Sequence, residues 1–161
     1  MGSSAPSRSE EIGGDLAVVF VTIAQLVFFV FFHRYISWPV TEPDGSVTRL
    51  SMLTDGYFTW LPFPITASIL VVVVTAIMII VNRYWFRQAT WILFCILGIM
   101  VTSSLLVIFP FDFSVLPNAR AVEVVPTAVR VFFILLAVFY GVTALVMLVQ
   151  FRKHISKKET E

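Results

Sequence analysis

Cysteine and histidine are scarce in this sequence, and their scarcity removes most catalytic and metal-binding sites. The one cysteine, Cys95, lies within a long apolar run, so we expect no internal disulfide, no paired-thiol redox site and no cysteine cluster for zinc. The two histidines, His33 and His154, fall on opposite faces of the membrane in the topology argued below, so they cannot share a haem iron or a catalytic site within one subunit. We therefore predict no catalytic, cofactor-binding or metal-binding residues, and a protein that is not an enzyme.

Charged residues are equally scarce. They make up 13% of the 161 residues, against about 25% in typical soluble domains, and hydrophobic residues make up 58%. The mean hydropathy is +0.92. The net charge of +1 comes without a basic stripe of the kind that neutralises phosphates, so nucleic acid is not an expected partner. The composition predicts a protein whose solvent is lipid.

Four apolar runs are each about as long as the ~20 residues that a helix needs to cross a bilayer. We predict an all-α integral membrane protein, a bundle of four transmembrane helices over residues 16–37, 61–82, 89–109 and 127–151, the last opened by Pro126. The bundle is a single domain of residues 15–152, between a flexible N-terminal tail at 1–14 and a basic C-terminal tail at 153–161. No ionisable side chain lies in the central part of any run, which disfavours a proton-coupled carrier.

The polar segments between the runs predict a small extracytoplasmic surface. Between residues 39 and 60, β-forming residues flank a Pro-Asp-Gly turn, which indicates a β-hairpin. The segment 110–117 alternates aromatic with polar residues, and we expect it to lie along the outer interface with Phe111 and Phe113 toward lipid. Asp112 is expected to pair with Arg120 or Arg130. Candidate polar contacts on this outer surface are His33, Arg34, Asp112, Arg120 and Arg130.

The distribution of bases predicts the orientation. The short loop 82–88 carries Arg83 and Arg87 and no acid, which is the kind of loop that the positive-inside rule keeps in the cytoplasm. The basic residues after 151 favour the same side. With four spans, both termini are then cytoplasmic, and the hairpin and the 110–125 segment lie outside.

Small and polar residues within the runs predict where helices associate. Cys95, Gly98 and Thr102 form a narrow strip on the third run, and Ala137, Gly141 and Ala144 form a small-residue face on the fourth. In the first run, Gln25 is expected to hydrogen-bond to another helix. These seven residues are the predicted helix-packing interface.

Three functions remain open at this point. The favoured one is a non-catalytic accessory or assembly subunit that binds another membrane protein, or copies of itself, through the small-residue faces of the third and fourth runs. The alternative is a homo-oligomeric channel for a small solute, lined by hydroxyls such as those of Thr22, Thr75 and Thr143. The third is a lipid or quinone pocket between helices. Its predicted walls are Phe28, Phe29, Phe31, Phe32, Phe132 and Phe133.

Overall fold

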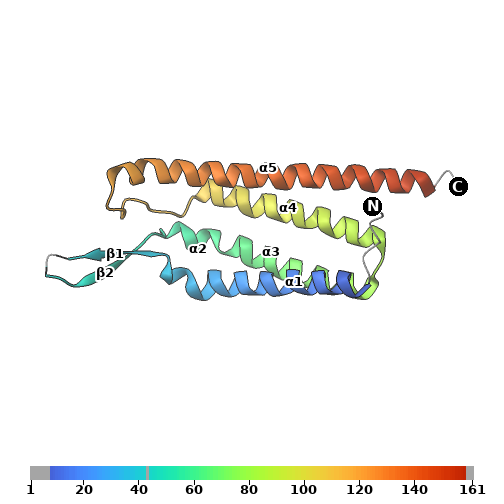
Figure 1. Cartoon of the computed structure of the whole chain (residues 1–161), viewed down its shortest axis with the longest axis horizontal. Helices are drawn as coiled ribbons and strands as arrows, with labels where there is room; N and C mark the ends of the chain where they lie inside the picture. Colours follow the sequence, from blue (N-terminus) through green and yellow to red (C-terminus); the bar gives the residue numbers. More distant parts are fainter. Residues whose placement is uncertain (1–7, 43, 159–161) are drawn as a thin grey trace, which may run out of the picture.

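Four long helices run side by side, alternately up and down, in the computed structural model, which describes residues 8–42 and 44–158 (Figure 1). The α-helices are α1 (Arg8–Val27), α2 (Gly56–Trp60), α3 (Pro62–Val81), α4 (Tyr84–Ile108) and α5 (Ala119–Lys158). A π-helical segment, η1 (Phe28–Phe32), and a 3-10 turn, η2 (His33–Tyr35), extend α1, and β1 (Ser37–Thr41) and β2 (Val47–Ser51) follow. The start of α1, the turn from α3 to α4 and the end of α5 share one end of the molecule, and the hairpin protrudes from the other.

The four predicted apolar helices are confirmed. Four helical segments are long and apolar enough to cross a membrane: Ile12–Tyr35, Gly56–Val81, Tyr84–Ile108 and Ala119–Arg152. Each includes most of its predicted run, and each begins four to eight residues before it. The large exposed side chains along these helices are overwhelmingly apolar, which is the opposite of the pattern on a helix that faces water.

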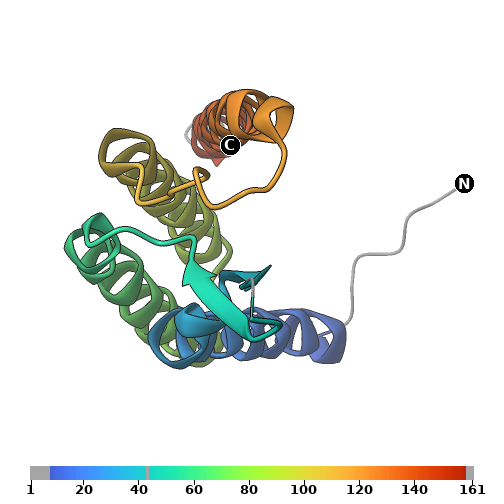
Figure 2. The ribbon, with the colours of Figure 1, turned by 90° about the vertical axis from the view of Figure 1, so that its left-hand side faces the viewer.

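The helices form an open arc in which each packs mainly on its neighbours. α1 packs on α3, α3 on α4, and α4 on α5. Figure 2, a view along the helices, shows α1 and α5 as the two ends of this arc. One side of the arrangement is therefore concave, and its two rims are different helices.

Both termini of the bundle differ from the prediction. α1 begins at Arg8, so residues 8–14, which we expected in a flexible tail, are helical, whereas residues 1–7 lie outside the described residues.

The last helix also begins early. Asn118 caps α5, because its Oδ1 accepts the backbone N–H of Arg120 at 2.9 Å. The helix then continues through Pro126, which lies inside it and does not open it as predicted. α5 thus spans 40 residues and ends at Lys158, so residues 153–158, which we expected in a C-terminal tail, continue the helix, whereas residues 159–161 lie outside the described residues.

The predicted β-hairpin is confirmed. β1 and β2 pair antiparallel, with Ser37 opposite Ser51 and Thr41 opposite Val47. At the turn, the Asp44 carboxylate accepts the hydroxyl and the backbone N–H of Ser46, and these bonds lower the pKa of Asp44 below its usual value. Gly45 has a φ of +86°, a conformation that glycine adopts without strain.

At the hairpin end, an aromatic cluster joins α1 to α2 and α4. Tyr57 and Trp60 of α2 are buried there with Leu105 of α4. The Tyr57 hydroxyl donates to the Phe29 carbonyl at 2.7 Å, inside the π-helical segment, where the backbone has departed from the regular α-helical bonding pattern. Phe29 meets Trp60 edge-to-face, with ring centroids 5.4 Å apart.

The 110–117 segment closes over this cluster and does not face lipid as predicted. Phe113 is buried, and Phe111 packs against the aromatic cluster. Backbone bonds hold the segment in place, because the Thr54 N–H donates to the Pro110 carbonyl and the Asp112 N–H donates to the Met52 carbonyl. Burial of aromatic surface and satisfied backbone groups favour this position over the interface.

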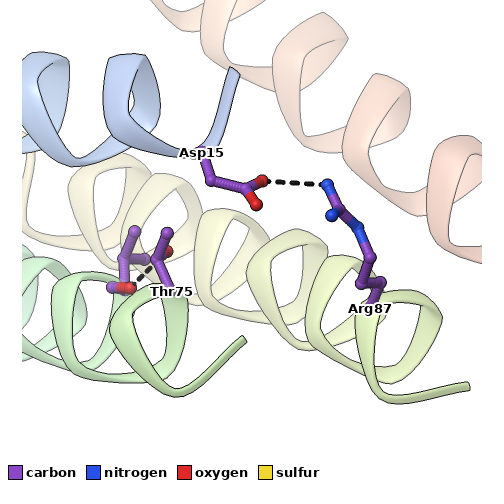
Figure 3. A network of polar contacts seen from close by, with 4 residues as sticks. Asp15, Thr75 and Arg87 are labelled. Carbon is purple, nitrogen blue, oxygen red and sulfur yellow. Dashed lines mark hydrogen bonds and ion pairs between the residues drawn. The ribbon is translucent and has the colours of Figure 1, made fainter. Parts of the chain in front are cut away.

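At the opposite end, an ion pair ties α1 to α4 (Figure 3). The Arg87 Nη2 donates to Asp15 Oδ1 at 3.1 Å, and the Asp15 side chain is 3% exposed against 20% for Arg87. Thr75 of α3, which is fully buried, lies nearby in the same view. Sequence analysis treated Arg87 only as a cytoplasmic loop base, whereas the structure also gives it a bond to a residue 72 positions away.

We predict that Asp15→Asn and Arg87→Gln each lower the free energy of unfolding by roughly 2–4 kcal/mol, because removal of one partner leaves the other charge poorly solvated. The double variant should lose less than the sum of the two. Arg83→Gln, at an exposed position of the same turn, should change stability by less than about 0.5 kcal/mol. Denaturation of the purified proteins in detergent measures the free energy of unfolding of the three single variants and the double variant. Additive losses would show that the pair is not coupled.

Candidate functional site

The concave side of the arc holds a groove with a volume of about 560 Å³. All four long helices contribute to its walls, with α3 and α4 as the floor and α1 and α5 as the rims. Residues of the aromatic cluster lie at its hairpin end. A second hollow, lined by residues 120–128, is bordered by α5 alone and therefore has no opposing wall. The groove is the candidate site.

The groove is lined mainly by apolar and aromatic side chains. They include Thr22 and Gln25 on α1, Phe29 on η1, Trp60 on α2, Trp91, Phe94, Cys95 and Gly98 on α4, and Phe133, Leu136, Tyr140 and Thr143 on α5. No Asp, Glu, Lys, Arg or His of the described chain is among its lining residues. Such a surface binds apolar molecules and disfavours ions, because a charge placed there would lose its hydration without gaining a counter-charge.

Two of the hydroxyls that line the groove are bonded within their own helices. Thr22 donates to the Val18 carbonyl at 2.7 Å, and Thr143 donates to the Phe139 carbonyl at 2.8 Å. Thr75 does the same with Val71 and is buried away from the groove. These three were among the hydroxyls proposed to line a channel, and this back-bonding occupies the donor that each would offer to a permeating solute.

Gln25 and Tyr140 are different. Gln25 was expected to bond to another helix, but its side chain lines the groove from α1 and makes no hydrogen bond to another described residue. Tyr140 lines the groove from α5, and its hydroxyl likewise has no partner among the described residues. Sequence reasoning missed Tyr140. The available signal was Gly98, since a glycine in an apolar helix indicates that something large approaches it.

The small-residue strip of the third run faces α5 of the same chain. Cys95 and Thr102 are buried, and the ring of Tyr140 stands over Gly98. A Cβ added at Gly98 would lie 3.0 Å from ring carbons of Tyr140, so the ring would have to move by a few tenths of an ångström to admit a larger residue. This strip is therefore occupied within the chain.

The small-residue face of the fourth run, Ala137, Gly141 and Ala144, has a different environment. A Cβ added at Gly141 would have no heavy atom within 4 Å apart from its local surroundings. Ala137, Gly141 and Ala144 are each partly exposed. This face is open at its centre.

The predicted outer-surface residues do not gather into one site. His33 stacks on Tyr57, with ring centroids 5.3 Å apart, and its Nδ1 lies 3.0 Å from the Val30 carbonyl oxygen. Arg34 and Arg120 are exposed. Arg130 lies over the Phe109 ring, 4.4 Å from its centroid, which is a cation–π contact.

The expected ion pair of Asp112 with Arg120 or Arg130 is not found among the described residues. Asp112 Oδ1 instead accepts the backbone N–H of Ser114 at 2.9 Å. The hydroxyl and N–H of Ser114 lower the pKa of Asp112 below its usual value. Local turn formation satisfies this carboxylate at little entropic cost, which a long arginine side chain cannot match.

The phenylalanine walls predicted for a lipid or quinone pocket are only partly correct. Phe29 and Phe133 line the groove. The other four, Phe28, Phe31, Phe32 and Phe132, are exposed on the outside of the bundle. No group of three or more metal-ligating side chains occurs within the part of the chain that the structure describes.

We predict that Gly98→Val lowers the free energy of unfolding by about 1–3 kcal/mol, because the new side chain must displace Tyr140. Gly141→Val is the matched control. It makes the same change of helix propensity at a position with open space, so stability should stay within about 0.5 kcal/mol of wild type. Thermal unfolding in detergent, at protein concentrations where the chain is monomeric, measures the stability of both variants. Equal losses at the two glycines would contradict the packing of Tyr140 on Gly98.

Comparisons with protein-family models, with curated proteins and with solved structures gave no match. The geometry of the groove is therefore the basis for a functional proposal.

Proposed function

We propose that this chain is a non-catalytic, four-pass membrane protein that holds an apolar, membrane-soluble molecule, a lipid or a quinone, in the groove. The groove itself carries the proposal. Its volume of about 560 Å³ lies within the ~300–1,000 Å³ that small-molecule sites typically have, and its walls are apolar and aromatic with few polar groups.

The arc explains how such a molecule would enter. In the proposed orientation the helices cross the bilayer, both termini and the turn carrying Arg83 are cytoplasmic, and the hairpin is outside. The rims of the groove, α1 and α5, are the two ends of the arc (Figure 2), so its mouth would face lipid. An apolar molecule would then pass from the bilayer into the groove without crossing water.

We prefer ligand binding in the groove to an assembly function because one of the two predicted association faces is already covered within the chain. The favoured prediction from sequence used the small-residue faces of both the third and the fourth runs. In the structure, Tyr140 of the same chain covers the third-run face at Gly98. A partner would have only the α5 face to bind.

Mass spectrometry of the purified protein tests the proposal. We expect organic extraction of protein purified in mild detergent to release a lipid or quinone in near-stoichiometric amount. Leu136→Trp, on the groove wall, should reduce that amount by at least about fivefold.

Leu135→Trp is the matched control. Leu135 is 63% exposed and lies outside the groove, so the same substitution one residue away should leave the amount unchanged. Equal retention by both variants, or wild-type protein without a specific molecule, would refute ligand binding in the groove.

A second function is favoured by the space at Gly141. The chain would be an accessory or assembly subunit that binds another membrane protein, or a second copy of itself, through Ala137, Gly141 and Ala144 of α5. Among the described residues, no heavy atom beyond the local surroundings lies within 4 Å of a Cβ added at Gly141, and small residues let helices approach closely in lipid.

This second function predicts a loss of assembly without a loss of fold. Gly141→Leu should reduce the molecular mass of the detergent-purified complex, as measured by light scattering, while the unfolding temperature of the isolated chain stays unchanged. A complex of unchanged size and composition would show that this face is exposed only to lipid.

A further inference from the structure

We infer that the ligand of the groove is neutral and carries a carbonyl or hydroxyl group that hydrogen-bonds to Gln25 and Tyr140. This inference rests on the proposed ligand-binding function and specifies its chemistry. It comes from two polar side chains that line the same apolar groove from opposite rims, Gln25 from α1 and Tyr140 from α5.

Both side chains lie at mid-depth. Gln25 is near the centre of the span Ile12–Tyr35, and Tyr140 stands over Gly98, near the centre of the span Tyr84–Ile108. Lipid chains at this depth offer no hydrogen bonds, and a polar group without a partner in such surroundings is costly. Neither side chain has a partner among the described residues, so a polar group on the ligand would satisfy them.

Three other polar side chains of the lining already have hydrogen-bond partners, whereas Ser68 and Thr102 are buried on the floor helices. Thr22 and Thr143 bond to carbonyls of their own helices, and the Trp60 indole N–H points to the Val101 carbonyl at 3.4 Å. The amide of Gln25 and the hydroxyl of Tyr140 each offer a donor and an acceptor. Together they match a carbonyl or a hydroxyl.

The absence of charge from the lining residues sets the charge of the ligand. An ionised carboxylate or phosphate at mid-depth would need a counter-charge, and the described lining supplies none. The ion pair of Asp15 and Arg87 lies at the end of the bundle and is not part of the lining. The polar end of the ligand is therefore neutral.

Two membrane components share this chemistry: isoprenoid quinones, whose flat rings carry carbonyls, and neutral lipids with a hydroxyl, such as fatty alcohols and glycerides. The aromatic walls, which include Trp91 and Phe94, offer surfaces for either a ring or a chain.

A competition assay on the full-length protein in detergent tests the inference. The labelled probe is a benzoquinone with an alkyl tail. The competitors are a fatty alcohol, the fatty acid at a pH where it is ionised, and an alkane, all of one chain length. We expect the quinone and the alcohol to bind at least about tenfold more tightly than the alkane and the ionised acid, because only they form the hydrogen bonds without a buried charge.

Two substitutions assign the hydrogen bonds. Tyr140→Phe and Gln25→Leu should each weaken binding of the quinone and of the alcohol by roughly fivefold and leave alkane binding unchanged, because only the hydrogen bond is lost. Tyr35→Phe and Gln150→Leu make the same changes at exposed positions outside the groove and should have no effect.

The outcomes separate this inference from the proposed function. If the alkane binds as tightly as the alcohol, or if the two groove variants leave all affinities unchanged, the groove binds apolar molecules but the inference is wrong. Tighter binding of the ionised acid would also overturn it. If no compound binds, both fail. A preference for the quinone or for the alcohol supports the inference and identifies the source of the ligand.

Discussion

The close packing of Tyr140 on Gly98 is the contact on which the rest of the arrangement depends. α5 is held against the bundle mainly by α4, and a side chain larger than hydrogen at residue 98 would push against the tyrosine ring. In lipid the hydrophobic effect does not drive helices together, so close contact and interhelical hydrogen bonds determine where a helix lies. The contact of Tyr140 with Gly98 is the point of closest approach recorded at a glycine, and it sets how near α5 lies to α4 at this level of the groove.

The other rim is fixed independently at its two ends. The Tyr57 hydroxyl bonds to the Phe29 carbonyl at the hairpin end, and Asp15 pairs with Arg87 at the opposite end. The first bond ties η1, the extension of α1, to α2, and the second ties α1 to α4. Neither of them reaches α5. Each rim is therefore fixed to the floor rather than to the other rim, which is the condition for a groove that opens to the side.

Sequence alone was sufficient for the features that depend on local composition. Long uncharged runs predicted four apolar helices, and Asp44 and Gly45 in a turn between β-forming residues predicted the hairpin. It was insufficient where a distant partner decides the outcome. The local sequence places Asp15 at the edge of a polar tail. Only the fold brings Arg87, 72 residues away, beside it. The same holds for Phe113, whose burial depends on the position of the preceding helices.

In the candidate site, too, the local sequence predicted the type of surface but not the distant residue that contacts it. The strip at Cys95, Gly98 and Thr102 was recognisable as a close-packing surface, but its occupant was not, because nothing in the local sequence of Tyr140 distinguishes it from a lipid-facing aromatic residue. Gln25 was recognisable as a polar group that needs a partner in hydrocarbon. That it faces a groove, and not a helix, depends on the separation of α1 from α5, which is a property of the whole arc.

The separation of the two rims in the membrane is the central claim, and disulfide cross-linking measures it directly. Thr22→Cys and Thr143→Cys, in a chain with Cys95→Ala, place thiols on opposite rims, and Leu53→Cys with Phe111→Cys is the positive control because these residues pair in a β-bridge. A disulfide requires Cα atoms about 4.4–6.8 Å apart. We predict that oxidation in membranes links residues 53 and 111, while residues 22 and 143 are joined only by a long bifunctional reagent. Efficient direct disulfide formation between residues 22 and 143 would show that α1 and α5 pack together, and would contradict the account.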